Sequence, residues 1–398
     1  MTGTELASWA DAPEPQEGAA CACCVGGHRV SASPEEGGGV PAGARDDMPS
    51  YSVGAAASQL ARDGISWAGQ ASGGISFGGG AGQGARVTYG FLAPADVSDD
   101  AHGDYRAMNA DEIAMVEYAM GVIAGVADIV FVRQAGAGGR YLDDPSHAQI
   151  VIDALAGSNG GLARTSWSGR VYQEAQVSIG EAGLEELGSY AFRTALHEVS
   201  HAVGLSHPGD YDKHVISYAA DAEYREDSAQ YTVMSYFGEA ATGADFGGAR
   251  STNLMLHDIA ALQRLYGANE ETRTGDTVYG FGSNTHDAGW TLDGADHAVV
   301  GAVWDAGGRD RLDFSGYGQD QRIDLAEEAF SDVGGLTANV AVARGAVIED
   351  AAGGSGDDTL SGNDADNVLA GGIGDDVLFG GAGDDVLYGD GGPTDWAG

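Results

Sequence analysis

Apolar residues recur at the spacing of an amphipathic helix in three segments of the chain. The longest is the run ADEIAMVEYAMGVIAGV, and the last ends just before Gly267. These patterns predict helices at residues 110–126, 190–203 and 253–266. Short stretches rich in β-branched and aromatic residues predict strands at residues 86–91, 128–132, 148–152 and 175–179. We therefore expect residues 51–266 to form one domain of mixed helices and strands.

Two segments lack such patterns. Residues 1–50 are rich in Gly, Ala, Pro and acidic residues, and we expect them to be disordered. Residues 69–84 are a glycine-rich spacer that cannot hold a helix.

A nine-residue repeat takes over near the C-terminus. Residues 353–388 divide into the units GGSGDDTLS, GNDADNVLA, GGIGDDVLF and GGAGDDVLY, with Leu at the eighth position of each. This is the calcium-binding nonapeptide, or RTX repeat, of parallel β-rolls. Its glycines allow tight turns with inward carbonyls, and each leucine faces the interior from a short strand. We expect residues 267–398 to form an all-β parallel β-roll.

Calcium suits this repeat because carbonyl and carboxylate oxygens are its preferred ligands. The second unit, GNDADNVLA, lacks two glycines and carries Asn for Asp, so a full site is not expected there. Without calcium the stacked carboxylates repel one another, and the region should be disordered. The expected ligands in the repeats are Gly354, Gly356, Asp358, Gly371, Gly372, Gly374, Asp376, Gly380, Gly381, Gly383 and Asp385.

The charge balance excludes several partners. The chain has 19 Lys and Arg residues against 60 Asp and Glu residues, a formal net charge of −41. Nucleic acids and anionic lipids need a basic surface, so neither is expected to bind. No apolar run reaches membrane-spanning length, which predicts no membrane insertion. The N-terminus is acidic and has no apolar core, unlike a Sec signal peptide.

The segment HEVSHAVGLSHP has the composition of a zinc site. On a helix His197 and His201 project from one face, and Glu198 stands beside them to take a proton from water. Gly204 lets the chain turn so that His207 becomes a third ligand. Three neutral nitrogens leave a fourth position open, as in catalytic zinc sites. A helix with solvated histidines is the alternative, which the fixed spacing of Gly204 and His207 disfavours.

Together with the later segment YTVMSYF, the motif HExxHxxGxxHP resembles the serralysin family of secreted bacterial zinc proteases. Pro208 favours that family, since related families usually carry Glu or Ser there. The resemblance implies an α+β metzincin-type catalytic domain in which Met234 forms an apolar floor below the metal. It also implies that Tyr236 lies near the metal and helps to stabilise the tetrahedral intermediate. His257 has no ligand partner at useful spacing and is expected to be a satisfied surface or core histidine.

The resemblance extends to other segments. It implies an opening helix at 52–67, a pro-segment at 1–50, and an edge strand at 175–179 along which substrate lies. It also implies a first calcium site between the domains, with ligands at Arg273, Gly275, Thr277, Asp305, Gly307, Gly308 and Asp310.

The expected function is that of a secreted, broadly specific zinc endopeptidase with one catalytic Zn²⁺ and several structural Ca²⁺ ions. Its expected partners are protein substrates and the type I secretion machinery, and it is expected to be an extracellular monomer. Serralysins usually continue beyond their repeats to an export signal, so the end at Gly398 indicates truncation or different export. The alternatives are an RTX calcium-binding or adhesion module with a decayed protease domain, and a surface-layer fragment.

The only cysteines of the chain are Cys21, Cys23 and Cys24. A thiolate could occupy the open zinc position and keep a precursor inactive. Alternatively the cluster has no role within a removable leader, and this interpretation is favoured because the segment resembles no thiol switch.

Overall fold

The computed structural model describes most of the chain after residue 47. The N-terminal segment, including Cys21, Cys23 and Cys24, lies outside the described residues, so the predictions made for it stay predictions. The described residues are 48–64, 66–67, 71–72, 75–76, 82–92, 105–134, 148–156, 160–168, 171–180, 184, 186–209, 211, 216–393 and 396.

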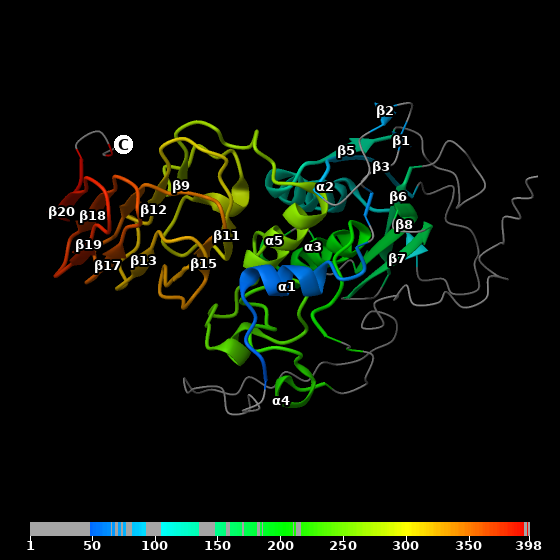
Figure 1. Cartoon of the computed structure of the whole chain (residues 1–398), viewed down its shortest axis with the longest axis horizontal. Helices are drawn as coiled ribbons and strands as arrows, with labels where there is room; N and C mark the ends of the chain where they lie inside the picture. Colours follow the sequence, from blue (N-terminus) through cyan, green and yellow to red (C-terminus); the bar gives the residue numbers. More distant parts are fainter. Residues whose placement is uncertain are drawn as a thin grey trace, which may run out of the picture.

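The N-terminal half contains a twisted sheet with the strand order β5–β3–β6–β8–β7 (Figure 1). All neighbouring pairs along this order are parallel except β7 and β8, which are antiparallel. A short strand β4 adds to β6, and β1 and β2 form a separate hairpin. The strand bounds are β1 Ala71–Ser72, β2 Ile75–Ser76, β3 Ala85–Phe91, β4 Tyr105–Arg106, β5 Ile129–Arg133, β6 Ile150–Leu155, β7 Gly161–Ser168 and β8 Val171–Gly180.

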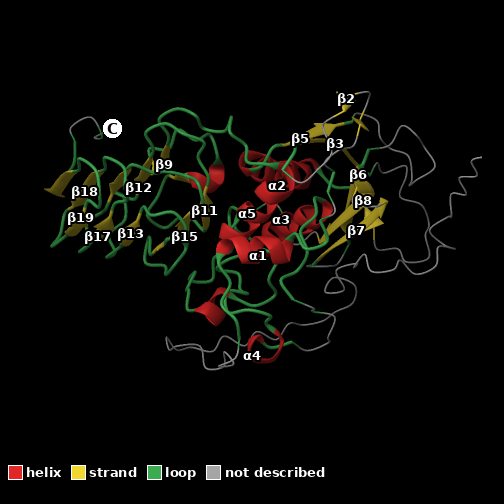
Figure 2. Cartoon of the chain, in the orientation of Figure 1, coloured by secondary structure: helices red, strands yellow, loops and turns green. Residues whose placement is uncertain are grey.

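The longer helices lie between this sheet and the C-terminal strands, as Figure 2 shows by colour. Asn109 caps α2 by accepting hydrogen bonds from the amides of Asp111 and Glu112, and Ser189 caps α3 by accepting one from Phe192. These caps explain why both helices begin where their apolar patterns begin. The helices are α1 Val53–Leu60, α2 Ala110–Val126, α3 Tyr190–Ala202, α4 Tyr218–Asp221 and α5 Leu256–Tyr266, with 3₁₀ turns η2 Glu239–Thr242 and η3 Ala288–Trp290.

The helix predicted over 52–67 is shorter than expected. It ends at Leu60, and a turn follows in which Gly64 adopts a φ of 58°. That left-handed conformation is incompatible with a continuing helix.

The edge position predicted for residues 175–179 is wrong. Strand β8 lies between β6 and β7, so β7 is the edge strand. The sequence of β7, GLARTSWS, mixes Gly, Arg and Ser and therefore lacks the pattern of β-branched residues that marks a strand. Its antiparallel pairing with β8 forms it instead.

Parallel strands in two stacks build most of the C-terminal half. One sheet has the order β10–β9–β12–β16–β18–β20, and a second has the order β13–β17–β19. A third sheet, β11–β15–β14, lies next to the helices (Figure 1). The bounds are β9 Val278–Phe281, β10 Thr291–Leu292, β11 Gly301–Val303, β12 Arg311–Asp313, β13 Arg322–Asp324, β14 Phe330–Ser331, β15 Val340–Val342, β16 Asp350–Ala352, β17 Thr359–Ser361, β18 Val368–Gly372, β19 Val377–Phe379 and β20 Val386–Asp390.

Two nine-residue units make one turn of these stacks. Leu369 pairs with Leu387 and Leu360 with Leu378, each pair being 18 residues apart in the sequence. Leu360 and Leu369 are fully buried, which agrees with the predicted interior position. Leu387 is 46% exposed because β20 is the last strand of its sheet and no described strand covers it.

The two halves share one apolar core. A single cluster of buried side chains runs from Val177 and Phe192 in the N-terminal half to Leu312 and Leu360 in the C-terminal half. Backbone hydrogen bonds also cross the boundary, since the amide of Ala302 donates to the carbonyl of Leu254 at 2.8 Å. Among the described residues, every helix is too short or too polar to span a bilayer.

Candidate metal centre

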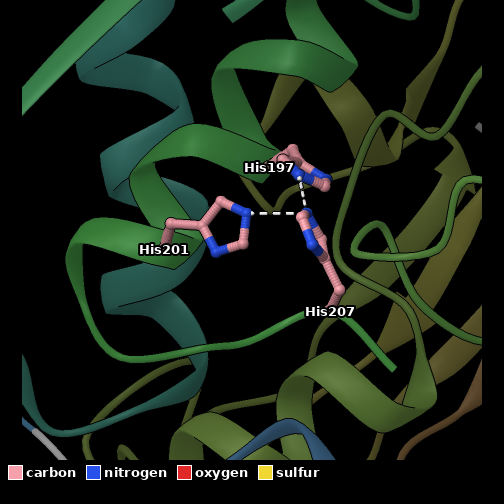
Figure 3. A group of neighbouring side chains, drawn as sticks. All are labelled: His197, His201 and His207. Atoms are coloured by element: carbon pink, nitrogen blue, oxygen red, sulfur yellow. Dashed lines mark hydrogen bonds between the residues drawn. The ribbon is translucent and has the colours of Figure 1, made fainter. Parts of the chain in front are cut away.

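Three histidine side chains converge at the C-terminal end of α3 (Figure 3). His197 and His201 project from α3 one turn apart, and His207 reaches them from the following loop. The Nε2 atom of His207 lies 3.2 Å from Nε2 of His197 and 3.0 Å from Nε2 of His201. The structure therefore brings together the three residues whose spacing suggested a metal site.

The loop that returns His207 depends on Gly204. This residue has a φ of 110°, a region that residues with a Cβ atom rarely adopt. Its amide donates to the carbonyl of His201, and the amide of Leu205 donates to that of Ser200. The helix thus ends in a tight turn that reverses the chain beneath His201.

Backbone carbonyls orient two of the three rings. Nδ1 of His197 lies 2.8 Å from the carbonyl oxygen of Val233, and Nδ1 of His201 lies 2.7 Å from that of Leu205. A carbonyl can only accept a hydrogen bond, so each Nδ1 carries the proton and each Nε2 presents a lone pair. Burial and the two neighbouring rings hold the pKa of His207 well below its usual value. Three convergent imidazole nitrogens are a donor set that fits zinc.

Glu198 follows His197 on the same helix and is buried. Strand β7 passes directly over it, and a Cβ atom on Gly161 would lie 2.4 Å from Cγ of Glu198. The first residue of the edge strand is therefore packed against the Glu198 side chain.

Met234 and Tyr236 come from the turn after residue 231. Met234 is fully buried, and the Tyr236 ring centroid lies 4.5 Å from that of His207 and 5.8 Å from that of His197. The structure thus places Tyr236 beside two of the three histidines.

Sequence reasoning missed the charged residues that hold this turn. Buried Asp258 accepts hydrogen bonds from Thr232 Oγ1, from the Val233 amide at 2.9 Å and from the Met255 amide at 3.0 Å. Arg193 donates to the Ser235 carbonyl at 2.6 Å. An acidic residue in the first turn of the predicted helix at 253–266 was the only available signal for Asp258. Its partner lies 25 residues away in sequence.

His257 stands apart from the histidine cluster. It is a core residue, 1% exposed, and its ring stacks on Tyr231 at 5.1 Å. Burial lowers its pKa to about 3. The core position agrees with the prediction, but its Nδ1 has no hydrogen-bond partner among the described residues, so the expectation of a satisfied histidine is wrong.

The loops before β17 and β19 fit calcium. Asp358 accepts hydrogen bonds from the amides of Gly354 and Gln321, and the Asp358 amide donates to Asp376 Oδ1. Asp376 Oδ2 is buried without a hydrogen-bond partner among the described residues. A Cβ atom on Gly372 would lie 2.1 Å from the Gly354 carbonyl oxygen. Close-packed carbonyls and a free buried carboxylate oxygen are ligands of the kind calcium takes.

The loop before β9 and the loop between β11 and β12 also come together. The Thr277 amide donates to Asp310 Oδ1 at 2.8 Å, and Asp310 Oδ2 is buried without a hydrogen-bond partner among the described residues. Burial and the neighbouring Asp305 raise the pKa of Asp310. Gly308, at a φ of 150°, approaches the Gly275 carbonyl so closely that a Cβ atom would lie 2.5 Å from its oxygen. Arg273 has a φ of 51°, Gly307 one of 137°, and both belong to these two loops.

On the side that faces the residues before β16, the loop at 362–367 is not arranged to bind a cation. Asn363 Nδ2 donates to the carbonyls of Ile348 at 2.8 Å and Leu325 at 3.1 Å. Asn367 Nδ2 donates to the Glu349 carbonyl at 2.8 Å. Amide protons thus occupy carbonyl oxygens that a calcium ion would need. On its other side, Asp385 accepts a hydrogen bond from the Asn367 amide, and the expected ligands Gly381 and Gly383 closely approach the carbonyls of Asn363 and Ala365. The expected ligand Gly374 approaches the Gly356 carbonyl in the same way, and Gly380 approaches the Asp385 side chain of its own unit.

Comparisons with known proteins agree on one family. Residues 268–394 match the family model described as the peptidase M10 serralysin C terminal. The chain is 40% identical to Serralysin A of Dickeya chrysanthemi over 78% of this chain and 64% of that protein. It is 52% identical to Serralysin B of the same organism over 46% of this chain and 38% of that protein. It is 38% identical to Metallopeptidase AprA of Pseudomonas marginalis over 78% of this chain and 65% of that protein. The chain therefore spans less than two thirds of the length of these relatives.

Proposed function

This chain belongs to the serralysin family, and from that premise we propose that it is a zinc-dependent endopeptidase that hydrolyses proteins with broad specificity. The observation that carries the proposal is the convergence of three histidine Nε2 atoms at the end of α3, the helix that also carries buried Glu198. Residues 51–266 would form the metzincin-type catalytic domain, and residues 267–398 the calcium-binding parallel β-roll. The 18-residue pairing of the C-terminal strands supports the second assignment.

In the proposed reaction His197, His201 and His207 hold one zinc ion. When bound, zinc polarises the scissile carbonyl and lowers the pKa of water at the site. Glu198 accepts a proton from the attacking water and passes it to the leaving amine, acting first as base and then as acid. Tyr236 donates a hydrogen bond to the oxygen on which negative charge develops.

The substrate would bind as an extended strand on the free edge of β7. Edge strands present unpaired backbone amides and carbonyls, and pairing to these does not depend on the substrate's side chains. The contact between Gly161 and Glu198 supports this position, because it brings the first residue of β7 against the side chain that the proposed reaction uses as a base. Backbone recognition would account for broad specificity.

Calcium ions would support the C-terminal strands through the loops around Asp310, Asp358 and Asp376. The proposal includes secretion, action outside the cell as a monomer, and export by a type I system. A non-catalytic calcium-binding module with a decayed protease domain is less well supported, because the three histidines converge and Glu198 follows His197 on the same helix.

The test is the substitution Glu198→Gln, which keeps the shape of the side chain and removes its basicity. We expect the variant to bind one zinc ion per chain and to lose cleavage of casein. The parent chain should cleave casein, and this cleavage should stop when a zinc chelator is added. Substantial casein cleavage by the fully zinc-loaded variant would remove Glu198 from this role, and chelator-resistant cleavage by the parent would exclude the zinc mechanism.

A further inference from the structure

A second tyrosine lies against the histidine cluster. The Tyr211 ring centroid lies 5.3 Å from that of His207 and 4.6 Å from that of Tyr236, with an interplanar angle of 34° to the latter. Tyr211 is buried, so its ring fills the space behind both side chains. Any displacement of this ring would move one or both of them.

A buried carboxylate fixes the ring in place. The Tyr211 hydroxyl donates to Asp227 Oδ1 at 2.5 Å, and the same oxygen accepts a hydrogen bond from Ser235 Oγ at 2.7 Å. Asp227 has no exposed surface. Since Ser235 directly precedes Tyr236, one carboxylate oxygen joins the loop after His207 to the turn that carries Tyr236.

The apolar surroundings of Tyr211 are too small to fix its position by packing alone. Tyr211 and Phe237 belong to a small apolar cluster that is separate from the main core, and Tyr236 packs against it. A satellite cluster of this size buries little apolar surface and cannot hold its members as firmly as the core does. The two hydrogen bonds to Asp227 are directional contacts that link Tyr211 to the turn carrying Tyr236.

We propose that Tyr211 and Asp227 are positioning residues that hold Tyr236 in its place beside His207. This inference rests on the proposed function, because it assigns Tyr236 a role in the transition state. Orientation errors on the order of 1 Å can cost about a hundredfold in rate, so loss of one anchor should reduce turnover without removing the histidine ligands.

The first test is a double-mutant cycle with Tyr211→Phe and Tyr236→Phe in the 398-residue chain. Tyr211→Phe keeps the ring and removes the hydroxyl, and we expect kcat for a peptide substrate to fall about tenfold, or roughly 1.4 kcal/mol at the barrier. KM and zinc affinity, measured by chelator competition, should stay within twofold of the parent. In the Tyr236→Phe background the same change should have no further effect, because residues that act as a unit are not additive.

A matched control is Tyr89→Phe. Tyr89 is also buried and donates to a carboxylate, Glu117, at 2.8 Å, but it lies on β3 in the sheet of the N-terminal half. Loss of the Tyr89 hydroxyl should leave kcat unchanged. Asp227→Asn keeps an oxygen acceptor for both hydroxyl donors and should restore most of the turnover that Asp227→Ala loses.

The second test does not depend on activity. In zinc-free protein, amide hydrogen exchange at Ala229 and Phe237, which anchor this turn, should speed up about tenfold in Tyr211→Phe. The positioning role would be overturned if Tyr211→Phe left amide exchange or kcat unchanged. It would also be overturned if Tyr211→Phe lowered kcat equally in the parent and in the Tyr236→Phe variant. A parent chain without zinc-dependent cleavage would overturn the proposed function instead, and the exchange experiment would still decide whether Tyr211 anchors the turn.

Discussion

Replacing Gly161 by alanine should disable the chain while leaving its histidine cluster intact. A Cβ atom at this position would lie 2.4 Å from Glu198 Cγ, 2.7 Å from Thr194 Cγ2 and 2.9 Å from Glu198 Oε1. Non-bonded carbons prefer separations of about 3.5–4.0 Å, so Glu198 or the strand β7 must move by about 1 Å. Glu198 is 1% exposed and Cγ is near the base of its side chain, so it cannot rotate into solvent.

Either response affects the reaction. A displacement of about 1 Å at a catalytic group costs on the order of a hundredfold in rate, which is roughly 2.7 kcal/mol at the barrier. A shift of β7 would also disturb the edge to which we expect substrate to bind. The overpacking should lower stability by about 1–3 kcal/mol, so the assay must be run well below the unfolding temperature.

The assay compares kcat/KM for a fluorogenic peptide, zinc per chain and thermal unfolding in Gly161→Ala and in a matched control. Gly121→Ala serves as that control, because Gly121 is exposed on α2 and a Cβ atom there meets nothing within 4 Å. It should leave kcat/KM unchanged and stabilise the helix by up to about 1 kcal/mol. A zinc-loaded Gly161→Ala variant with kcat/KM within threefold of the parent would refute the assigned contact between β7 and Glu198.

Two further predictions concern buried polar groups. Asn363→Gly combined with Asn367→Asp removes the amides that donate to the carbonyls of Ile348 and Glu349 and recreates the glycine and aspartate of the other units. Equilibrium dialysis should then detect about one more calcium ion per chain, and an unchanged number would show that the amides do not exclude the ion. Burial raises the pKa of Asp153 to about 6. The native chain therefore binds more protons than the unfolded chain between about pH 4 and pH 6, and this group's contribution to stability falls as pH rises through that window, by roughly 3 kcal/mol in total. Urea unfolding of Asp153→Asn, which cannot titrate there, should show a smaller loss of stability between pH 4.5 and pH 7.5 than the parent, and equal losses would contradict the raised pKa.

Local geometry explains which parts of the site could be predicted from the sequence. His197 and His201 are four residues apart on a helix, so their common face follows from helical geometry alone. The nine-residue repeat likewise implied short strands, and pairing at 18 residues follows once two units complete one turn. In both cases the information lies within one short segment.

The remaining features depend on tertiary contacts that no local pattern records. Asp258 meets Val233 across 25 residues, and Asp227 joins Tyr211 to Ser235 from a loop without secondary structure. Strand β7 forms because β8 offers it a partner, although its own side chains do not favour a strand. Each case needs the fold before the contact can be recognised.

The C-terminal strands also bear on the metal centre through a short series of hydrogen bonds. Ala302 in β11 donates to the Leu254 carbonyl, and the next residue, Met255, donates to Asp258. The same oxygen of Asp258 accepts a hydrogen bond from the amide of Val233. The carbonyl of Val233 in turn accepts a hydrogen bond from Nδ1 of His197. Asp258 is fully buried and cannot exchange these partners for water without opening the core. The strands expected to depend on calcium therefore support the segment that orients a histidine of the cluster, which gives a physical reason for one chain to combine both kinds of site.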